Sequence, residues 1–147
     1  MKSIITLMLA LCLNAFAHDE GHGPKLTDAP KQGGLVSSVV LASEASKGTK
    51  AELVYKSELV RSSSGKVSVY YYDKDMNPLK ADSFAKKAKA QLITVKKGKV
   101  SVQNFELQFV QDHFEGQAPK PARKPYNIDV KVMDGSRELL AAFDNLD

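Results

Sequence analysis

The chain has 147 residues, with 21 lysines and arginines against 17 acidic residues and a formal net charge of +4. This length suits one domain with a substantial hydrophobic core. The mild positive charge is not typical of a nucleic-acid-binding protein, and no later segment has the roughly 18 apolar residues that a membrane helix needs. We therefore expect no nucleic-acid partner and no transmembrane segment in the mature chain.

The first 17 residues have the features of an export signal. A positively charged start is followed by the apolar residues 4–13 and by Ala-Phe-Ala, a small-x-small cleavage pattern that ends at Ala17. Cleavage there makes His18 the N-terminus and places the mature protein in the periplasm. Cys12, the single cysteine, raises the alternative of a lipoprotein, but a bulky leucine precedes it. We expect cleavage after Ala17, which leaves no cysteine for a disulfide.

The mature chain divides into a leader and one folded domain. Residues 18–34 are rich in Gly, Pro, Asp and Lys and show no apolar periodicity, so we interpret them as a flexible leader. From residue 35 to residue 147, apolar and polar residues recur in patterns of strand length, and this range is the expected domain.

Alternation with a period of two is typical of half-buried strands. In the segment 66–73 it places Tyr71 in the core and leaves Tyr70 and Tyr72 on the outer face, with their hydroxyls in water. The expected strands cover residues 35–42, 49–59, 66–73, 90–95, 99–102, 105–109, 126–132 and 139–143. A set of seven or eight short strands with hardly any helix favours an all-β fold, an immunoglobulin-like two-sheet antiparallel β-sandwich.

Three local features allow more than one interpretation. Residues 81–89 suit either a strand or a turn or two of helix. The apolar phase changes after Val102, which a β-bulge near Gln103 or Asn104 would explain. The lysines within residues 86–99 either keep a strand edge or hairpin tip soluble, or they dock on anionic headgroups or acidic envelope polymers.

The leader carries two of the three histidines and is the candidate metal site. A free α-amine beside the imidazole of His18 offers two nitrogens, which suit Cu(II). His22 and the carboxylates of Asp19 and Glu20 can fill further positions, and imidazole with carboxylate also suits Zn(II) or Ni(II). His113 is the candidate for a third histidine ligand. The alternative is that a disordered leader contains two histidines by chance or for solubility.

The sequence contains no recognisable catalytic set. It has no nucleophile elbow, phosphate loop or dinucleotide fingerprint. The segment 18–22 reads His-Asp-Glu-Gly-His, but a zinc-protease helix needs glutamate directly after the first histidine, and Gly21 opposes a helix. We therefore expect that the protein is not an enzyme.

Several motifs carry a family resemblance. They are Gly33-Gly34, Ala51-Glu52-Leu53-Val54, the Val-x-Val-Tyr-Tyr-Tyr-Asp of residues 67–73, Asn77-Pro78-Leu79 and Phe114-Glu115-Gly116. The body with these motifs resembles a group of small exported β-sandwich proteins and adaptor-linked domains that occur with heavy-metal efflux systems. Gln32 stands where that group often has a histidine. The N-terminal His18 is also similar to that of CopC-type periplasmic copper carriers, which implies a ligand role for this residue.

Our hypothesis from the sequence is an exported, monomeric, non-enzymatic β-sandwich protein. It binds or buffers copper or zinc through its leader and hands the ion to an efflux or other envelope protein. The alternative is an envelope interaction or structural module without metal dependence. In that case the sandwich edge, or the face that carries Tyr70 and Tyr72, binds another protein.

Overall fold

The computed structural model describes residues 22–147, which form eight strands and one 3-10 helix. The elements are β1 (Leu35–Leu41), η1 (Ala42–Lys50), β2 (Tyr55–Arg61), β3 (Lys66–Tyr72), β4 (Lys87–Lys96), β5 (Lys99–Val110), β6 (His113–Gln117), β7 (Tyr126–Asp134) and β8 (Arg137–Leu146). The expected signal peptide, including Cys12, lies outside the described residues. No helix among the described residues is long and apolar enough to cross a bilayer.

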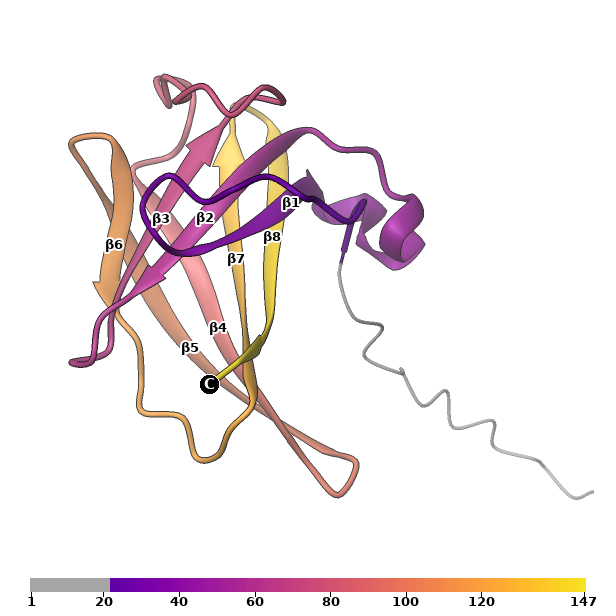
Figure 1. The fold of residues 1–147 in the computed structure, drawn as a ribbon, viewed down its shortest axis with the longest axis vertical. Coiled ribbons are helices and arrows are strands. Elements are labelled where there is room, and N and C mark those ends of the chain that lie inside the picture. Colours follow the sequence, from indigo (N-terminus) through magenta and orange to yellow (C-terminus); the bar gives the residue numbers. More distant parts are fainter. Residues whose placement is uncertain (1–21) are drawn as a thin grey trace, which may run out of the picture.

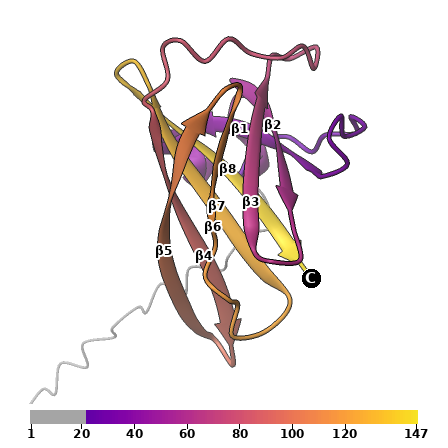
Figure 2. The same cartoon turned by 90° about the vertical axis from the view of Figure 1, so that its left-hand side faces the viewer.

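The eight strands form one closed antiparallel barrel in the order β1-β2-β3-β6-β5-β4-β7-β8 (Figures 1 and 2). Short turns join β2 to β3, β4 to β5, β5 to β6 and β7 to β8. Residues 73–86 connect β3 to β4 at one end of the barrel, and residues 118–125 connect β6 to β7 at the other (Figure 1). β1 closes the barrel, because Val39 lies opposite Tyr55 of β2 and also opposite Ala141 of β8.

The expected two-sheet immunoglobulin-like sandwich is therefore wrong, although the all-β class is right. In a sandwich, two separate sheets face each other across the core. Here every strand pairs with a neighbour on both sides, and the first and last strands pair with each other. Sandwiches and small barrels both bury alternate residues of each strand, so the alternation in the sequence is the same for the two folds.

Inward side chains from all eight strands fill the barrel. Phe114, Phe143 and Leu59 are among its largest fully buried residues. Tyr71 is also buried, as predicted, and its ring lies edge-on to Phe84 and Phe114 with centroids 5.1 and 5.9 Å away. The interior is thus a packed core, as in other barrels of eight strands.

The chain before β1 covers part of the outer face of β2 and β3. Outward residues of a barrel are usually solvated, yet Lys56, Glu58 and Tyr72 are each less than a tenth exposed. Residues 24–34 curve across these strands in Figure 1, and Asp28 of this segment pairs with Lys56 at 2.8 Å. The expectation that the Tyr72 hydroxyl is in water is wrong, because this outer layer buries it.

Two local predictions also differ from the structure. The strand expected from residue 49 starts only at Tyr55, because η1 continues to Lys50; within η1, Gly48 takes a positive φ of 56°. No bulge occurs near Gln103, because β4 and β5 pair one residue to one along their length. The change of apolar phase instead reflects valines that remain on the outer face. Of residues 81–89, the last three belong to β4, and the others form an irregular segment with one turn and an isolated β-bridge between Phe84 and Asp134.

Candidate functional site

Of the five predicted metal ligands, three fall outside the described residues. The other two, His22 and His113, lie in different parts of the structure. His18, Asp19 and Glu20 precede the described range, so the structure gives no geometry for them. His22 is the first residue that the structure describes, and it lies against η1. His113 begins β6, on the opposite side of the barrel from η1 (Figures 1 and 2).

His22 is held by its ring and by the peptide that follows it. Its Nδ1 atom lies 2.9 Å from the carbonyl oxygen of Ala45 in η1, and the N–H of Gly23 donates to Gly48 O at 2.9 Å. A carbonyl oxygen only accepts hydrogen bonds, so Nδ1 carries the proton in this contact. The lone pair of a neutral His22 ring is therefore on Nε2.

Glycine is required directly after His22. Gly23 has φ +112°, and a Cβ at this position would overlap the side chains of Ser38 and Val40 on β1. The hydroxyl of Ser38 also donates to the carbonyl oxygen of Pro24. These contacts bring the chain close enough to β1 and η1 for the His22 ring to reach Ala45.

A cleft of about 280 Å³ opens beside His22. Its lining combines polar residues, among them Thr49 and Asp144 of β8, with apolar residues such as Leu26 and Val36. The imidazole of His22 and the carboxylate of Asp144 are groups that can bind a cation. Among residues 22–147, however, no three or more His, Cys, Asp or Glu side chains are grouped closely enough to hold a metal ion.

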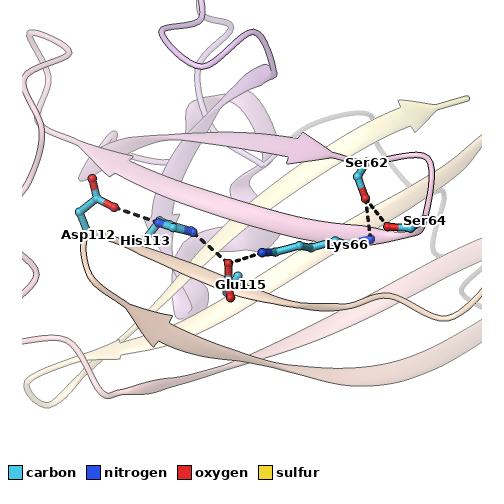
Figure 3. A network of polar contacts seen from close by, with 6 residues as sticks. All are labelled: Ser62, Ser64, Lys66, Asp112, His113 and Glu115. Carbon is cyan, nitrogen blue, oxygen red and sulfur yellow. Dashed lines mark hydrogen bonds and ion pairs between the residues drawn. The ribbon is translucent and has the colours of Figure 1, made fainter.

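His113 lies in a polar network on the outside of the barrel (Figure 3). Its Nδ1 is 2.9 Å from Asp112 Oδ1, and its Nε2 is 3.3 Å from Glu115 Oε2. Lys66 also contacts Glu115 at 2.7 Å, and the hydrogen bonds from Lys66 and His113 hold the pKa of that carboxyl below its ordinary value. The ring of His113 stacks on Tyr70 with centroids 4.7 Å apart. Both ring nitrogens thus face carboxylates, and a metal would have to displace one of them.

Glu58 is a buried carboxylate that the sequence analysis did not single out. Its two oxygens accept hydrogen bonds from the backbone N–H groups of Lys31, Gln32 and Gly34, at 2.8 to 2.9 Å, and from the Tyr72 hydroxyl at 3.1 Å. Burial alone would raise the pKa of Glu58, but the N–H donors and Tyr72 more than offset this effect and lower it. Glu58 therefore ties the end of the leader to the barrel wall.

Comparisons of the chain with protein-family models, with curated proteins and with solved structures found no match. The resemblances to metal-efflux-associated proteins and to CopC-type carriers stay predictions. The site geometry around His22 carries the functional argument that follows.

Sequence signals for these contacts are weak. Glu58 stands in an ordinary strand pattern between Ser57 and Leu59, where an outward glutamate is common. The hydrogen bond from His22 to Ala45 joins residues 23 positions apart, through a loop whose composition indicates only a turn. Gly23 is the one useful local signal, since glycine often marks a close approach between backbones.

Proposed function

We propose that this protein is an exported, non-enzymatic metal-binding protein that binds Cu(II) or Zn(II) through its N-terminal segment. The observation that supports this proposal is the 2.9 Å contact between His22 Nδ1 and Ala45 O. Metal-binding histidines usually donate the N–H of one ring nitrogen to a carbonyl or carboxylate, which orients the other nitrogen toward the metal. His22 has this arrangement, whereas both nitrogens of His113 face carboxylates.

The remaining ligands come from residues 18–20 in this proposal. Cleavage after Ala17 gives His18 a free amine next to its imidazole, and Asp19 or Glu20 adds a carboxylate. Two nitrogens from His18 and Nε2 of His22 make a nitrogen-rich set that suits Cu(II), and imidazole with carboxylate suits Zn(II). Fixing His22 on η1 lowers the ordering cost, because fewer free ligands must be arranged when the ion binds.

Metal titration of the correctly processed protein tests the proposal. The mature chain starting at His18 is compared with a version carrying one extra alanine before His18, and with His22→Gln. We expect both changes to weaken Cu(II) binding at least about tenfold, which is about 1.4 kcal/mol. His113→Gln is the matched control and should bind as the unmodified protein does.

Two results would contradict the proposal. One is a mature protein whose affinity for both Cu(II) and Zn(II) is weaker than about 100 μM, roughly −5.5 kcal/mol. The other is an unchanged affinity in His22→Gln, which would show that the oriented imidazole is not a ligand. Unfolding curves of each variant, measured without metal, show whether the substitution has altered the barrel itself.

A further inference from the structure

The hairpin of β4 and β5 extends beyond the barrel as a two-stranded arm. β4 pairs with β7 only from Lys89 to Ile93, whereas its pairing with β5 continues to Lys96 opposite Lys99. Residues 94–101 therefore have no partner strand other than each other, and both views show them projecting from one end of the barrel (Figures 1 and 2). We call residues 94–101 and the adjoining Val102 the arm.

One face of the arm is apolar and exposed. Val95 lies directly opposite Val100, and Val102 lies opposite Ile93, so these side chains share the outer face of the hairpin. Val95, Val100 and Val102 are 42, 54 and 45 % exposed, although valine is normally among the most buried residue types. None of the three belongs to the hydrophobic core, because they point away from the barrel interior. The three valines thus offer neighbouring apolar side chains to a partner.

The tip of the arm and the loop next to it are basic, although Asp147 lines a pocket together with Lys120 and Lys124. Lys96, Lys97 and Lys99 surround the tip of the arm, and Lys120, Arg123 and Lys124 lie in the neighbouring loop, residues 118–125. All six are exposed, and neither the arm nor the loop contains an acidic residue. Among the ion pairs of the described residues, none involves these six cations.

A cleft of about 540 Å³ separates the arm from the loop. Lys96, Arg123 and Lys124 line it together with the hydroxyl-bearing Thr94 and Ser101. Cationic groups next to hydroxyl donors are the chemistry that binds a phosphate. The cleft is therefore suited to an anionic headgroup, while the valines on the outer face of the arm need an apolar environment.

The geometry points to a surface that docks on the anionic phospholipids of a bilayer. The valines of the arm enter the boundary between headgroups and acyl chains, and the lysines at its tip and on its opposite face, where Lys96 pairs with Lys99, contact lipid phosphates. The cleft between the arm and the loop takes one headgroup. A partner with acidic groups alone would use the charges but would leave the three valines in water, so the exposed valines favour the bilayer. This docking is independent of the metal proposal.

Vesicle sedimentation in the presence of EDTA tests the proposal without any contribution from bound metal. The mature protein is mixed with vesicles of phosphatidylcholine, with and without phosphatidylglycerol. We expect binding only to the anionic vesicles, and its loss at about 1 M salt, where the Debye length is about 3 Å. A protein that does not sediment with anionic vesicles at low salt would overturn the proposal and would show that the lysines only keep the hairpin tip soluble.

Two triple variants separate charge from apolar insertion. Changing Lys96, Lys97 and Lys99 to Gln should weaken binding to anionic vesicles about tenfold or more. The matched control changes Lys50 of η1 and Lys74 and Lys80 of the connection 73–86 to Gln, which removes the same charge outside the arm and the loop and should leave binding unchanged. Equal losses in the two variants would mean that net charge, and not the arm, drives binding.

The second triple variant changes Val95, Val100 and Val102 to Ser and keeps every charge. We expect binding to weaken about tenfold or more, because the apolar contribution to membrane binding scales with the area that is buried. Binding equal to that of the unmodified protein would overturn the proposal in favour of an acidic protein or polymer as partner.

A fluorescence reporter keeps the test decisive if a triple variant fails to fold. The chain has no tryptophan, so Val100→Trp introduces a single one at the most exposed of the three valines. Its emission should shift to shorter wavelength with anionic vesicles and remain unchanged with phosphatidylcholine alone. Emission that stays unshifted with anionic vesicles would show that the arm does not enter the bilayer.

Discussion

Tyr71 and Tyr72 are neighbours in β3, but their hydroxyl groups have opposite environments. Tyr71 points into the barrel, and within residues 22–147 its hydroxyl is the buried side-chain polar atom without a hydrogen-bond partner. Burial raises its pKa far above the ordinary value. Tyr72 points outward under the leader and donates to Glu58 at 3.1 Å. Alternation along the strand predicts the first environment but not the second, because the covering layer is remote in sequence.

Removing each hydroxyl should therefore change stability in opposite directions. A buried polar group without a partner costs roughly 1 to 3 kcal/mol, so Tyr71→Phe should raise the free energy of unfolding by about 1 kcal/mol. Tyr72→Phe should lower it by about 1 to 2 kcal/mol, since a hydrogen bond to a charged carboxylate is lost. Urea denaturation of the two variants beside the unmodified protein measures both changes. Destabilisation of similar size in both variants would contradict the assignment of Tyr71 as unpartnered.

At the scale of elements, the leader and the arm show what composition reveals and what it does not. Gly, Pro and Lys indicate that residues 18–34 lack regular structure, and the described part, from His22, indeed forms no helix or strand before β1. Composition does not show that Glu58 binds three backbone N–H groups of this segment. Similarly, the valines after residue 99 indicate a strand. They do not show that this strand extends beyond the barrel, which depends on the residues with which it pairs. Mobility of the leader remains a prediction.

The attachment of the leader should depend on Glu58 and on pH. Glu58→Gln leaves one acceptor oxygen and places an amide N–H₂ against backbone donors, so we expect a loss of about 2 to 4 kcal/mol at neutral pH. The pKa of Glu58 is lowered from an ordinary value of 4.5, so its contribution is complete above that pH. It is lost as the pH falls below 4.5 and through the lowered pKa of the folded state.

Denaturant unfolding at several pH values, with amide hydrogen exchange, measures this attachment. The stability difference between the unmodified protein and Glu58→Gln should shrink as the pH falls below 4.5. The amides of Lys31, Gln32 and Gly34 should exchange slowly in the unmodified protein and faster in the variant. Exposed Glu52 supplies the control, because Glu52→Gln should change stability by no more than about 0.5 kcal/mol. A pH-independent difference would show that the charge of Glu58 is not what holds the leader.

At the scale of the whole molecule, the sequence predicts the all-β class and most strand positions but not the closure of the sheet. A barrel differs from a sandwich in the pairing of β1 with β8, for example Val39 with Ala141. These residues lie about a hundred positions apart, and small apolar side chains suit either fold at both places. The two proposed sites could not be predicted from the sequence for the same reason. The position of the His22 ring and the basic cleft beside the arm both depend on contacts between distant segments.

Closure of the barrel also needs close approach between strands, and Gly116 of β6 allows it. A Cβ at this position would lie well inside van der Waals contact of the Glu106 carbonyl oxygen and of the Leu107 side chain on β5. Because a backbone oxygen in a closed sheet cannot move independently, Gly116→Ala should destabilise the whole barrel. Overpacking of this kind typically costs about 1 to 3 kcal/mol. Guanidinium denaturation, followed by far-UV and near-UV circular dichroism, measures the loss.

Gly98, at the tip of the arm, provides the matched comparison for Gly116. Nothing lies within 4 Å of a Cβ built at Gly98, so Gly98→Ala meets only the strain of its φ of +76°. That strain costs roughly 1 to 2 kcal/mol in the folded state when the turn is held in place. The arm lies outside the barrel wall and can relax, so the loss should be at the lower end of this range and smaller than that of Gly116→Ala. Equal or greater stability in Gly116→Ala than in Gly98→Ala would show that β6 does not need its glycine to complete the barrel.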